Sequence, residues 1–265
     1  MKHLLLLCTL LISFNSFADE LSDANDAYER GDYSTAFTLV EKLAEQGNTK
    51  AQHNLGLMYY KGEGTPQDYK ASIKWYTKSA EQGYASAQNN LGNMYRKGEG
   101  TPQDYKAAIK WYTKVAEQGD ATAQYNLGLM YVKGLGIPQD YKAAIKWWTK
   151  AAEQGYASAL YNLGLMYYKG EGTPQDYKAA IKWYTKSAEQ GYVSAQYNLG
   201  FMYKNGEGTP QDYVMAYMIW NIAAANGNES SREVRDELAD MMTPNQIEQA
   251  QVLAKEWMEI KSGWR

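Results

Sequence analysis

A six-residue phrase, Asn-Leu-Gly-x-Met-Tyr, recurs along this chain at a constant spacing of 36 residues. Its five copies begin at Asn54, Asn90, Asn126, Asn162 and Asn198. A fixed period of roughly 20–50 residues is typical of a solenoid, in which each repeat buries its apolar face against the next one. The period therefore predicts a repeat fold and favours binding over catalysis as the function.

The same period predicts how the chain is divided. We expect five repeats of 36 residues, each ending at a glycine: 48–83, 84–119, 120–155, 156–191 and 192–227. A shorter N-terminal unit at 19–47 precedes them, and capping helices at 228–265 follow. No linker or change of composition interrupts the repeats, so a single elongated domain is expected.

Residues 1–18 differ from everything that follows. Lys2 and His3 precede the apolar run 4–14, and small residues stand at Ser16 and Ala18. This order is that of a secretory signal peptide cleaved after Ala18, and the apolar run is too short to span a bilayer. An uncleaved anchor is the alternative interpretation. We therefore expect an exported protein, resident in the periplasm or secreted, with no transmembrane span after cleavage.

Charge and cysteine content narrow the possible partners. Removal of residues 1–18 deletes Lys2 and no acidic residue, so the net charge changes from −3 to −4. This balance gives no electrostatic basis for binding nucleic acid. Cys8 is the single cysteine and lies in the segment expected to be removed, so the mature chain must be stabilised by packing alone.

Each repeat is expected to form a pair of helices. In the first repeat, Ala51, Leu55, Met58 and Tyr59 share one face of a helix that covers about residues 50–60. Gly62 then supplies a stop, and Thr65 or Asp68 can cap a second helix that runs to about residue 81. A glycine recurs in the middle of every first helix, which predicts a close approach of a neighbouring element that a side chain would block.

About ten positions recur in order in every repeat. In the first unit they are Ala51, Leu55, Gly56, Tyr59, Gly62, Gly64, Asp68, Trp75, Tyr76, Ala80 and Gly83. This pattern resembles the Sel1-like repeat, a relative of the tetratricopeptide repeat. The resemblance implies an all-α fold, an α/α superhelical solenoid of helix-turn-helix repeats that acts mainly as an adaptor for other proteins. The first helix of each pair, called helix A here, then lines the concave groove, and the second is helix B.

The last repeat indicates how the solenoid ends. Helix B of repeats one to four carries lysines at three positions spaced by four residues. We call these residues the lysine stripe: Lys70, Lys74, Lys78, Lys106, Lys110, Lys114, Lys142, Lys146, Lys150, Lys178, Lys182 and Lys186. In repeat five the same positions hold Val214, Met218 and Ile222. We expect a C-terminal helix after Pro244 to cover this apolar face and the protein to be a monomer, with a dimer or partner interface as the alternative.

Catalytic motifs are scarce, and we expect no enzyme, no cofactor and no metal site. After cleavage one histidine, His53, and no cysteine remain, which excludes a zinc site of His and Cys ligands. Cysteine-rich relatives have been linked to β-lactams, but the paired cysteines, Ser-x-x-Lys and Lys-Thr-Gly are all missing. A cell-envelope enzyme or inhibitor, related to β-lactams or the cell wall, is kept as an alternative function, as is a secreted host-contact factor.

The positions at which the repeats differ are the candidate ligand surface. They lie at three places on one stripe of helix A, which we call the variable stripe. The first place holds His53, Asn89, Tyr125, Tyr161 and Tyr197; the second holds Leu57, Asn93, Leu129, Leu165 and Phe201; the third holds Tyr60, Arg96, Val132, Tyr168 and Lys204. Aromatic side chains suit recognition, since they give a large contact area and a polar tip. Neutral drift among duplicated repeats is the alternative.

The five asparagines that open each phrase adjoin this stripe. An asparagine amide can donate to and accept from an extended peptide, so Asn54, Asn90, Asn126, Asn162 and Asn198 could hold a peptide in register. Alternatively, each amide satisfies groups within the fold. The lysine stripe is expected to be a solvated outer face, with attraction of an anionic envelope component as the alternative. The sequence thus predicts an exported scaffold that binds a protein or peptide on helix A.

Overall fold

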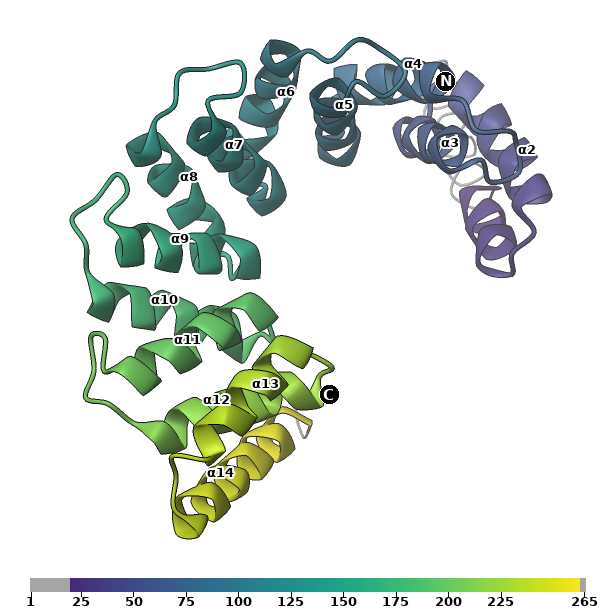
Figure 1. The fold of residues 1–265 in the computed structure, drawn as a ribbon. Helices are drawn as coiled ribbons and strands as arrows, with labels where there is room; N and C mark the ends of the chain where they lie inside the picture. Colours follow the sequence, from purple (N-terminus) through teal and green to yellow (C-terminus); the bar gives the residue numbers. More distant parts are fainter. Residues whose placement is uncertain (1–19, 263–265) are drawn as a thin grey trace, which may run out of the picture. The chain divides into compact units, whose positions relative to one another are not determined.

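The computed structural model describes residues 20–262, and these residues form helices joined by short turns, with no strand among them. A helix at residues 20–29 comes first. It is followed by α2 (Tyr33–Glu45), α3 (Thr49–Lys61), α4 (Tyr69–Glu81), α5 (Ala85–Lys97), α6 (Tyr105–Glu117), α7 (Ala121–Lys133), α8 (Tyr141–Glu153), α9 (Ala157–Lys169), α10 (Tyr177–Glu189), α11 (Val193–Asn205), α12 (Tyr213–Ala225), α13 (Glu229–Ala239) and α14 (Pro244–Ser262) (Figure 1). The expected all-α solenoid of helix pairs is confirmed. The expected signal peptide lies outside the described residues.

Local chemistry explains where the helices begin and end. In helix B of the first repeat, Oδ1 of Asp68 accepts hydrogen bonds from the backbone N–H groups of Lys70 and Ala71, so the aspartate caps the helix. Helix A ends at Gly62, whose φ of 77° is left-handed and strains any residue with a side chain. Helix A thus ends within one residue of the prediction, and Asp68 is the cap of helix B among the two residues that the sequence left open.

The turn between the two helices is closed by a glutamine. Nε2 of Gln67 donates to the carbonyl oxygen of Tyr60 at 2.8 Å, which satisfies a carbonyl that the end of helix A leaves free. The same contact is present in each of the remaining four repeats, from Gln103 to Arg96, Gln139 to Val132, Gln175 to Tyr168 and Gln211 to Lys204. The same glutamine contact therefore closes the turn in all five repeats.

The glycine in the middle of helix A marks the closest approach within a repeat. A Cβ added at Gly56 would lie 2.7 Å from Cδ1 of Tyr76, which is buried on helix B. The ring of Tyr112, Trp148, Tyr184 or Trp220 lies in the same way against the glycine of its repeat. The expected close approach is confirmed, and the element that a side chain would hit is an aromatic ring.

The described residues divide into two compact units. One contains residues 20–123 and 135–137, and the other contains 124–134 and 138–262. In each unit, helices that are adjacent in sequence contact one another, as α3 does with α4 and α9 with α10. The core of each unit lies between these helices, with Leu55 and Tyr76 among its fully buried side chains in the first. The single domain stays a prediction.

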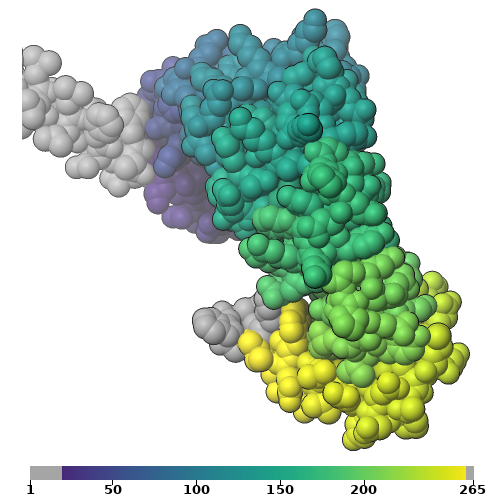
Figure 2. All heavy atoms as spheres, turned by 90° about the vertical axis from the view of Figure 1, so that its left-hand side faces the viewer, coloured from purple at the N-terminus to yellow at the C-terminus, as the bar shows by residue number. Residues whose placement is uncertain are grey.

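In the second unit the last repeat is covered by the C-terminal helices. Helix α12 contacts both α13 and α14, and Figure 2 shows the yellow atoms of the C-terminal segment packed on the green atoms of the last repeat. Met218 and Ile222, which replace lysines of the lysine stripe, are 9% and 3% exposed. The expected capping helix is therefore confirmed, and the apolar substitutions on α12 are explained by it.

Candidate functional site

The first position of the variable stripe lies inside the fold. The ring of His53 is half-buried between the rings of Tyr76 and Tyr84, with centroids 5.6 and 5.1 Å away. Tyr125 and Tyr161 contact Tyr156 and Tyr192 in the same way, each at 5.2 Å. In each of these cases the partner is the residue that opens the next repeat. Side chains at this position therefore stabilise the stacking of one repeat on the next.

Asn89 shows that variation at this position has an internal cause. It is buried, and its Nδ2 donates to Oδ1 of Asp120 at 2.9 Å. Asp120 occupies the place that Tyr84, Tyr156 and Tyr192 take in other repeats, where it also caps α7 through the backbone N–H of Ala123. An aromatic pair in three interfaces is thus replaced by a hydrogen-bonded pair in one. The two members of the pair change together.

The repeated asparagines have partners within the fold. Nδ2 of Asn90 lies 3.2 Å from Nε2 of His53 in the previous repeat, and Oδ1 of Asn54 lies 3.2 Å from Nδ1 of the same ring. Nδ2 of Asn198 donates to the hydroxyl of Tyr184 at 3.3 Å. These contacts agree with the alternative in which the amides satisfy polar groups of the fold, and peptide binding by them stays a prediction.

Burial shifts the pKa values of the tyrosines and of the histidine that contact these asparagines. Desolvation raises the pKa of Tyr76 and of Tyr184 well above the ordinary value, and hydrogen bonding with Asn90 or Asn198 opposes the rise. Burial lowers the pKa of His53, opposed by its hydrogen bond with Asn54. All three side chains are therefore neutral at pH 7, and the layer offers amide and hydroxyl groups instead of charges.

A pocket opens between α3 and α5, in the first unit, at the second and third positions of the variable stripe. Its volume is about 330 Å³, and Leu57, Tyr60, Asn90, Asn93 and Arg96 are among the residues that line it. Four of these residues belong to the variable stripe, and Asn90 is one of the repeated asparagines beside it. The structure thus brings together residues from two repeats that the sequence pattern alone could only place on separate helices.

Pockets recur at equivalent places elsewhere. In the second unit, one of about 290 Å³ lies between α9 and α11 and is lined by Leu165, Tyr168, Asn198 and Phe201, among others. Near the N-terminus, one of about 200 Å³ is lined by Asn54, Leu57 and residues of the helix at 20–29. Leu129, Val132, Asn126 and Asn162 are half-buried on α7 and α9. At these three places, neighbouring helices thus form pockets with an apolar floor and an amide wall.

Arg96 gives the pocket between α3 and α5 a distinct charge. Its Nε is buried and has no hydrogen-bond partner, and the described residues provide no ion pair to its guanidinium group. The hydroxyl of Tyr112 interacts with Arg96, and this contact opposes the rise that burial causes in the pKa of Tyr112. Nζ of Lys97 lies 3.3 Å from Oε1 of Glu99, which lines the same pocket and whose Oε2 is buried without a hydrogen-bond partner. A partly buried cation without a carboxylate partner is suited to binding an acidic group.

The lysine stripe behaves differently from the variable stripe. Its lysines are exposed, and several lie over tryptophan rings of the same helix: Nζ of Lys78 is 4.3 Å from the centroid of Trp75, and Nζ of Lys150 is 4.7 Å from that of Trp147. Such cation–π contacts shield the half-buried face of an indole. This arrangement agrees with a solvated outer face, and binding of an anionic component stays a prediction.

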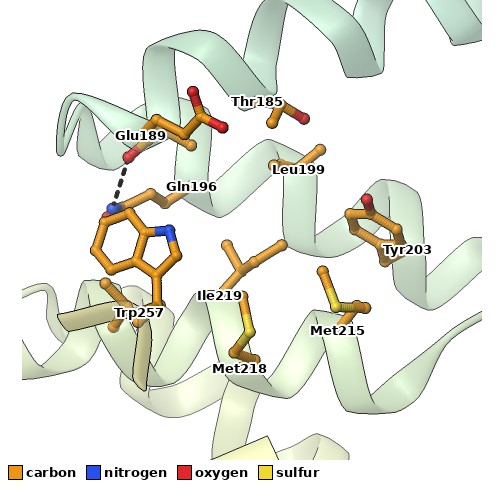
Figure 3. A pocket seen from close by; sticks show the side chains of 11 residues that line it. Thr185, Glu189, Gln196, Leu199, Tyr203, Met215, Met218, Ile219 and Trp257 are labelled. Carbon is orange, nitrogen blue, oxygen red and sulfur yellow. Dashed lines mark hydrogen bonds between the residues drawn. The ribbon is translucent and has the colours of Figure 1, made fainter. Parts of the chain in front are cut away.

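Sequence reasoning missed two features of the surface. Tyr76, Lys97 and Glu99 also line the pocket between α3 and α5, although they do not vary between repeats in a way that marks them. The other missed feature is a further pocket, apolar in lining, between α10, α11, α12 and α14 (Figure 3). Its signal in the sequence was the change of Trp75, Trp111, Trp147 and Trp183 to Ile219 in the last repeat.

Within residues 20–260, the acidic side chains and His53 do not gather into a metal site. No cluster of three or more His, Cys, Asp or Glu residues could hold a metal there. In the same part of the chain, the ring nitrogens of His53 face the amides of Asn54 and Asn90, so no carboxylate orients the ring. No helix in the described range is long and apolar enough to cross a membrane.

The fold defines a helical repeat protein with pockets along the surface of its helices A. The Sel1 repeat matches residues 24–48, 49–84, 85–120, 121–156, 157–192 and 193–228. The chain therefore belongs to the Sel1 repeat family. Members of this family generally mediate protein–protein interactions, and their scaffold is typically not that of an enzyme.

Solved structures and a curated relative agree with this assignment. The structure of c5321, a protective antigen present in uropathogenic Escherichia coli strains, is 39% identical with a TM-score of 0.82, over 92% of this chain and 53% of that one. The chain thus spans about half the length of that protein. A Sel1 repeat protein from Oxalobacter formigenes is 34% identical with a TM-score of 0.75, over 91% of this chain and 96% of that one. DAP3-binding cell death enhancer 1 of Mus musculus is 46% identical over 43 residues, which are 16% of this chain and 8% of that protein.

Proposed function

We propose that this protein is an exported scaffold that binds a protein or peptide partner on its helix-A face, the face expected to be concave. The observation that carries the proposal is the recurrence of pockets between consecutive helices A. Each combines an apolar floor with amide groups, as a peptide with alternating side chains and backbone groups would require. Export rests on the segment 1–18, and the description of an E. coli relative as a protective antigen supports it.

The pockets differ in charge, and this difference suggests which kind of side chain each would receive. Arg96 makes the pocket between α3 and α5 suited to an acidic side chain. The pocket between α9 and α11 offers Leu165 and Phe201 to an apolar one. A partner segment with an acidic residue and a separate apolar residue is therefore the expected ligand class.

Site-specific crosslinking tests the proposal directly. A photoreactive phenylalanine replaces Asn93 or Leu165, which line pockets, and Lys110 on the exposed lysine stripe serves as the matched control. The modified chain is irradiated in the cell envelope fraction, and adducts are identified by mass spectrometry. We expect the same partner at both pocket positions and not at Lys110. Equal crosslinking at all three positions, or only at Lys110, would overturn the proposal.

The alternative of an envelope enzyme or inhibitor has its own test. The purified protein is incubated with cell-wall fragments and with β-lactams, and product formation is followed by chromatography. Because His53 is held by amide groups and carries no orienting carboxylate, we expect no turnover. Turnover that is lost in His53→Ala would replace the scaffold proposal with an enzymatic one.

A further inference from the structure

The turn between helix A and helix B carries a glutamate in four of the five repeats and a leucine in the remaining one. The residues at this place are Glu63, Glu99, Leu135, Glu171 and Glu207, each between two glycines. The substitution removes a carboxylate from repeat three only. What that carboxylate does in the other repeats therefore shows what repeat three lacks.

The turn glutamate accepts a hydrogen bond from the preceding unit of the stack. The hydroxyl of Tyr168, at the third position of the variable stripe, donates to Oε1 of Glu207 at 3.4 Å across 39 residues. Near the N-terminus, the hydroxyl of Tyr28 donates to Oε2 of Glu63 at 2.6 Å. The carboxylate is thus the acceptor for a side chain near the end of the preceding unit's first helix.

In repeat two the third position of the variable stripe holds Arg96, and the residue 39 positions later is Leu135. The turn of Leu135 is seated as in the last repeat. A Cβ added at Gly136 would lie 2.6 Å from Cβ of Tyr105, and the equivalent atoms of the last repeat would be 2.8 Å apart. Arg96 and Leu135 belong to the same compact unit. Arg96 therefore meets a leucine where Tyr168 meets a carboxylate.

The charges beside Arg96 do not neutralise it. The pocket between α3 and α5 is lined by two cations, Arg96 and Lys97, and by one carboxylate, Glu99, so one positive charge remains. Oε1 of Glu99 lies 3.3 Å from Nζ of Lys97, whereas Arg96 is half-buried and interacts with the neutral hydroxyl of Tyr112. A guanidinium group that has lost part of its hydration without gaining a carboxylate is stabilised by a ligand that supplies one.

We propose that Leu135 is a specificity-determining residue of the helix-A surface, because it leaves Arg96 to bind an aspartate or glutamate side chain of the partner. This inference rests on the proposed function and names the residue that selects an acidic partner at this pocket. The partner's carboxylate takes the place that Glu207 has beside Tyr168. A glutamate at position 135 would fill this place from within the chain and exclude the ligand.

The test uses two small probes that differ in charge. Acetyl-glutamate amide carries a single carboxylate, and acetyl-glutamine amide is its uncharged counterpart. The full protein is labelled with ¹⁵N-arginine, and the Nε–H signal of Arg96, assigned with Arg96→Lys, is followed in titrations. We expect acetyl-glutamate amide to shift this signal and acetyl-glutamine amide to bind about tenfold more weakly. Absence of a shift with acetyl-glutamate amide, or equal affinity for the two probes, would overturn the proposal.

Two variants isolate the role of Leu135. Leu135→Glu copies the four other turns, so it should keep the Tm of the wild type and weaken the binding of acetyl-glutamate amide about tenfold. Leu135→Gln is the matched control, with the same length and no charge, and should leave the affinity unchanged. Equal affinity in Leu135→Glu and the wild type, or an equal loss in both variants, would refute the role of Leu135.

These titrations are independent of the test of the scaffold. The probes replace the partner, so a negative result overturns the role of Leu135 and leaves partner binding on the helix-A surface to be decided by crosslinking. If crosslinking through Asn93 and Leu165 fails while acetyl-glutamate amide still binds at Arg96, the scaffold proposal is the one that falls.

Discussion

Gly56 in α3 lies directly against the buried ring of Tyr76 in α4, and a Cβ added at Gly56 would come within 2.7 Å of Cδ1 of that ring. Glycine normally costs a helix about 1 kcal/mol relative to alanine. The chain accepts that cost in five successive repeats, with Tyr or Trp as the partner. The absence of a side chain is therefore what allows the aromatic ring to lie between the two helices.

The first prediction concerns this contact. Gly56→Ala should destabilise the protein by about 1–3 kcal/mol, because the overpacked ring costs more than the helix propensity gains. The change in the free energy of unfolding is measured by urea denaturation, with circular dichroism as the readout. In the Tyr76→Leu background the same substitution should cost less. A Gly56→Ala protein that is more stable than the wild type would contradict the account.

A second prediction addresses the repeated asparagines. Asn90→Ala removes an amide that contacts His53 and lines the pocket between α3 and α5, so the free energy of unfolding should fall by about 1 kcal/mol. Differential scanning calorimetry measures this loss. Asn126→Ala and Asn162→Ala should then be compared for partner binding. Reduced stability with full partner binding would show that the amides serve the fold alone.

The third prediction is a pH dependence that arises from His53. Burial lowers its pKa below the ordinary 6.5, so the unfolded chain binds more protons than the folded one when the pH falls below that value. The stability contributed by the neutral ring is present above pH 6.5 and is lost as the pH decreases through the region below it. His53→Tyr copies Tyr125 and Tyr161 and removes this titration.

Tm values between pH 5 and 8 compare wild type with His53→Tyr, because other groups titrate equally in both proteins. The difference should be constant above pH 6.5, the ordinary pKa, and should turn against the wild type below it. A difference that is the same at every pH would show that the folded state does not depress the pKa of His53.

The capping of the last repeat leads to the fourth prediction. Ile222→Lys restores a lysine of the stripe at a position that is 3% exposed beneath the C-terminal helices, so it buries a charge and should lower stability by several kcal/mol. The reverse change, Lys186→Ile, is the matched control at an exposed position and should alter stability by no more than about 0.5 kcal/mol. Chemical denaturation compares the two, and equal effects would argue against burial by α13 and α14.

The sequence predicted the fold well because its signals are local. Gly62 and Asp68 mark the end of one helix and the start of the next, and each acts on backbone groups within a few residues of itself. The loss of three lysines from helix B predicted a covering helix, and α14 lies there. Such features need no knowledge of distant neighbours, and the period repeats them five times.

The candidate site was predicted less completely, since it depends on contacts across repeats. The variation of His53, Asn89 and Tyr125 resembled a surface shaped by a partner, yet each of these side chains contacts the first residue of the next repeat. A spacing of 31 residues between Asn89 and Asp120 gave no signal until the helices were placed in register. The pockets at Leu57 and Leu165 also required two helices at once.

The glutamine that closes each interhelix turn has a consequence for how this chain can change in length. Because Gln67 holds the carbonyl of Tyr60 over a span of seven residues, a residue added to or removed from the turn breaks that bond and displaces helix B. Insertions within a repeat are therefore disfavoured, whereas gain or loss of a whole 36-residue segment, such as 84–119, preserves every turn. Natural variants of this protein should accordingly differ by single substitutions or by whole 36-residue repeats, and not by insertions or deletions of a few residues within a turn.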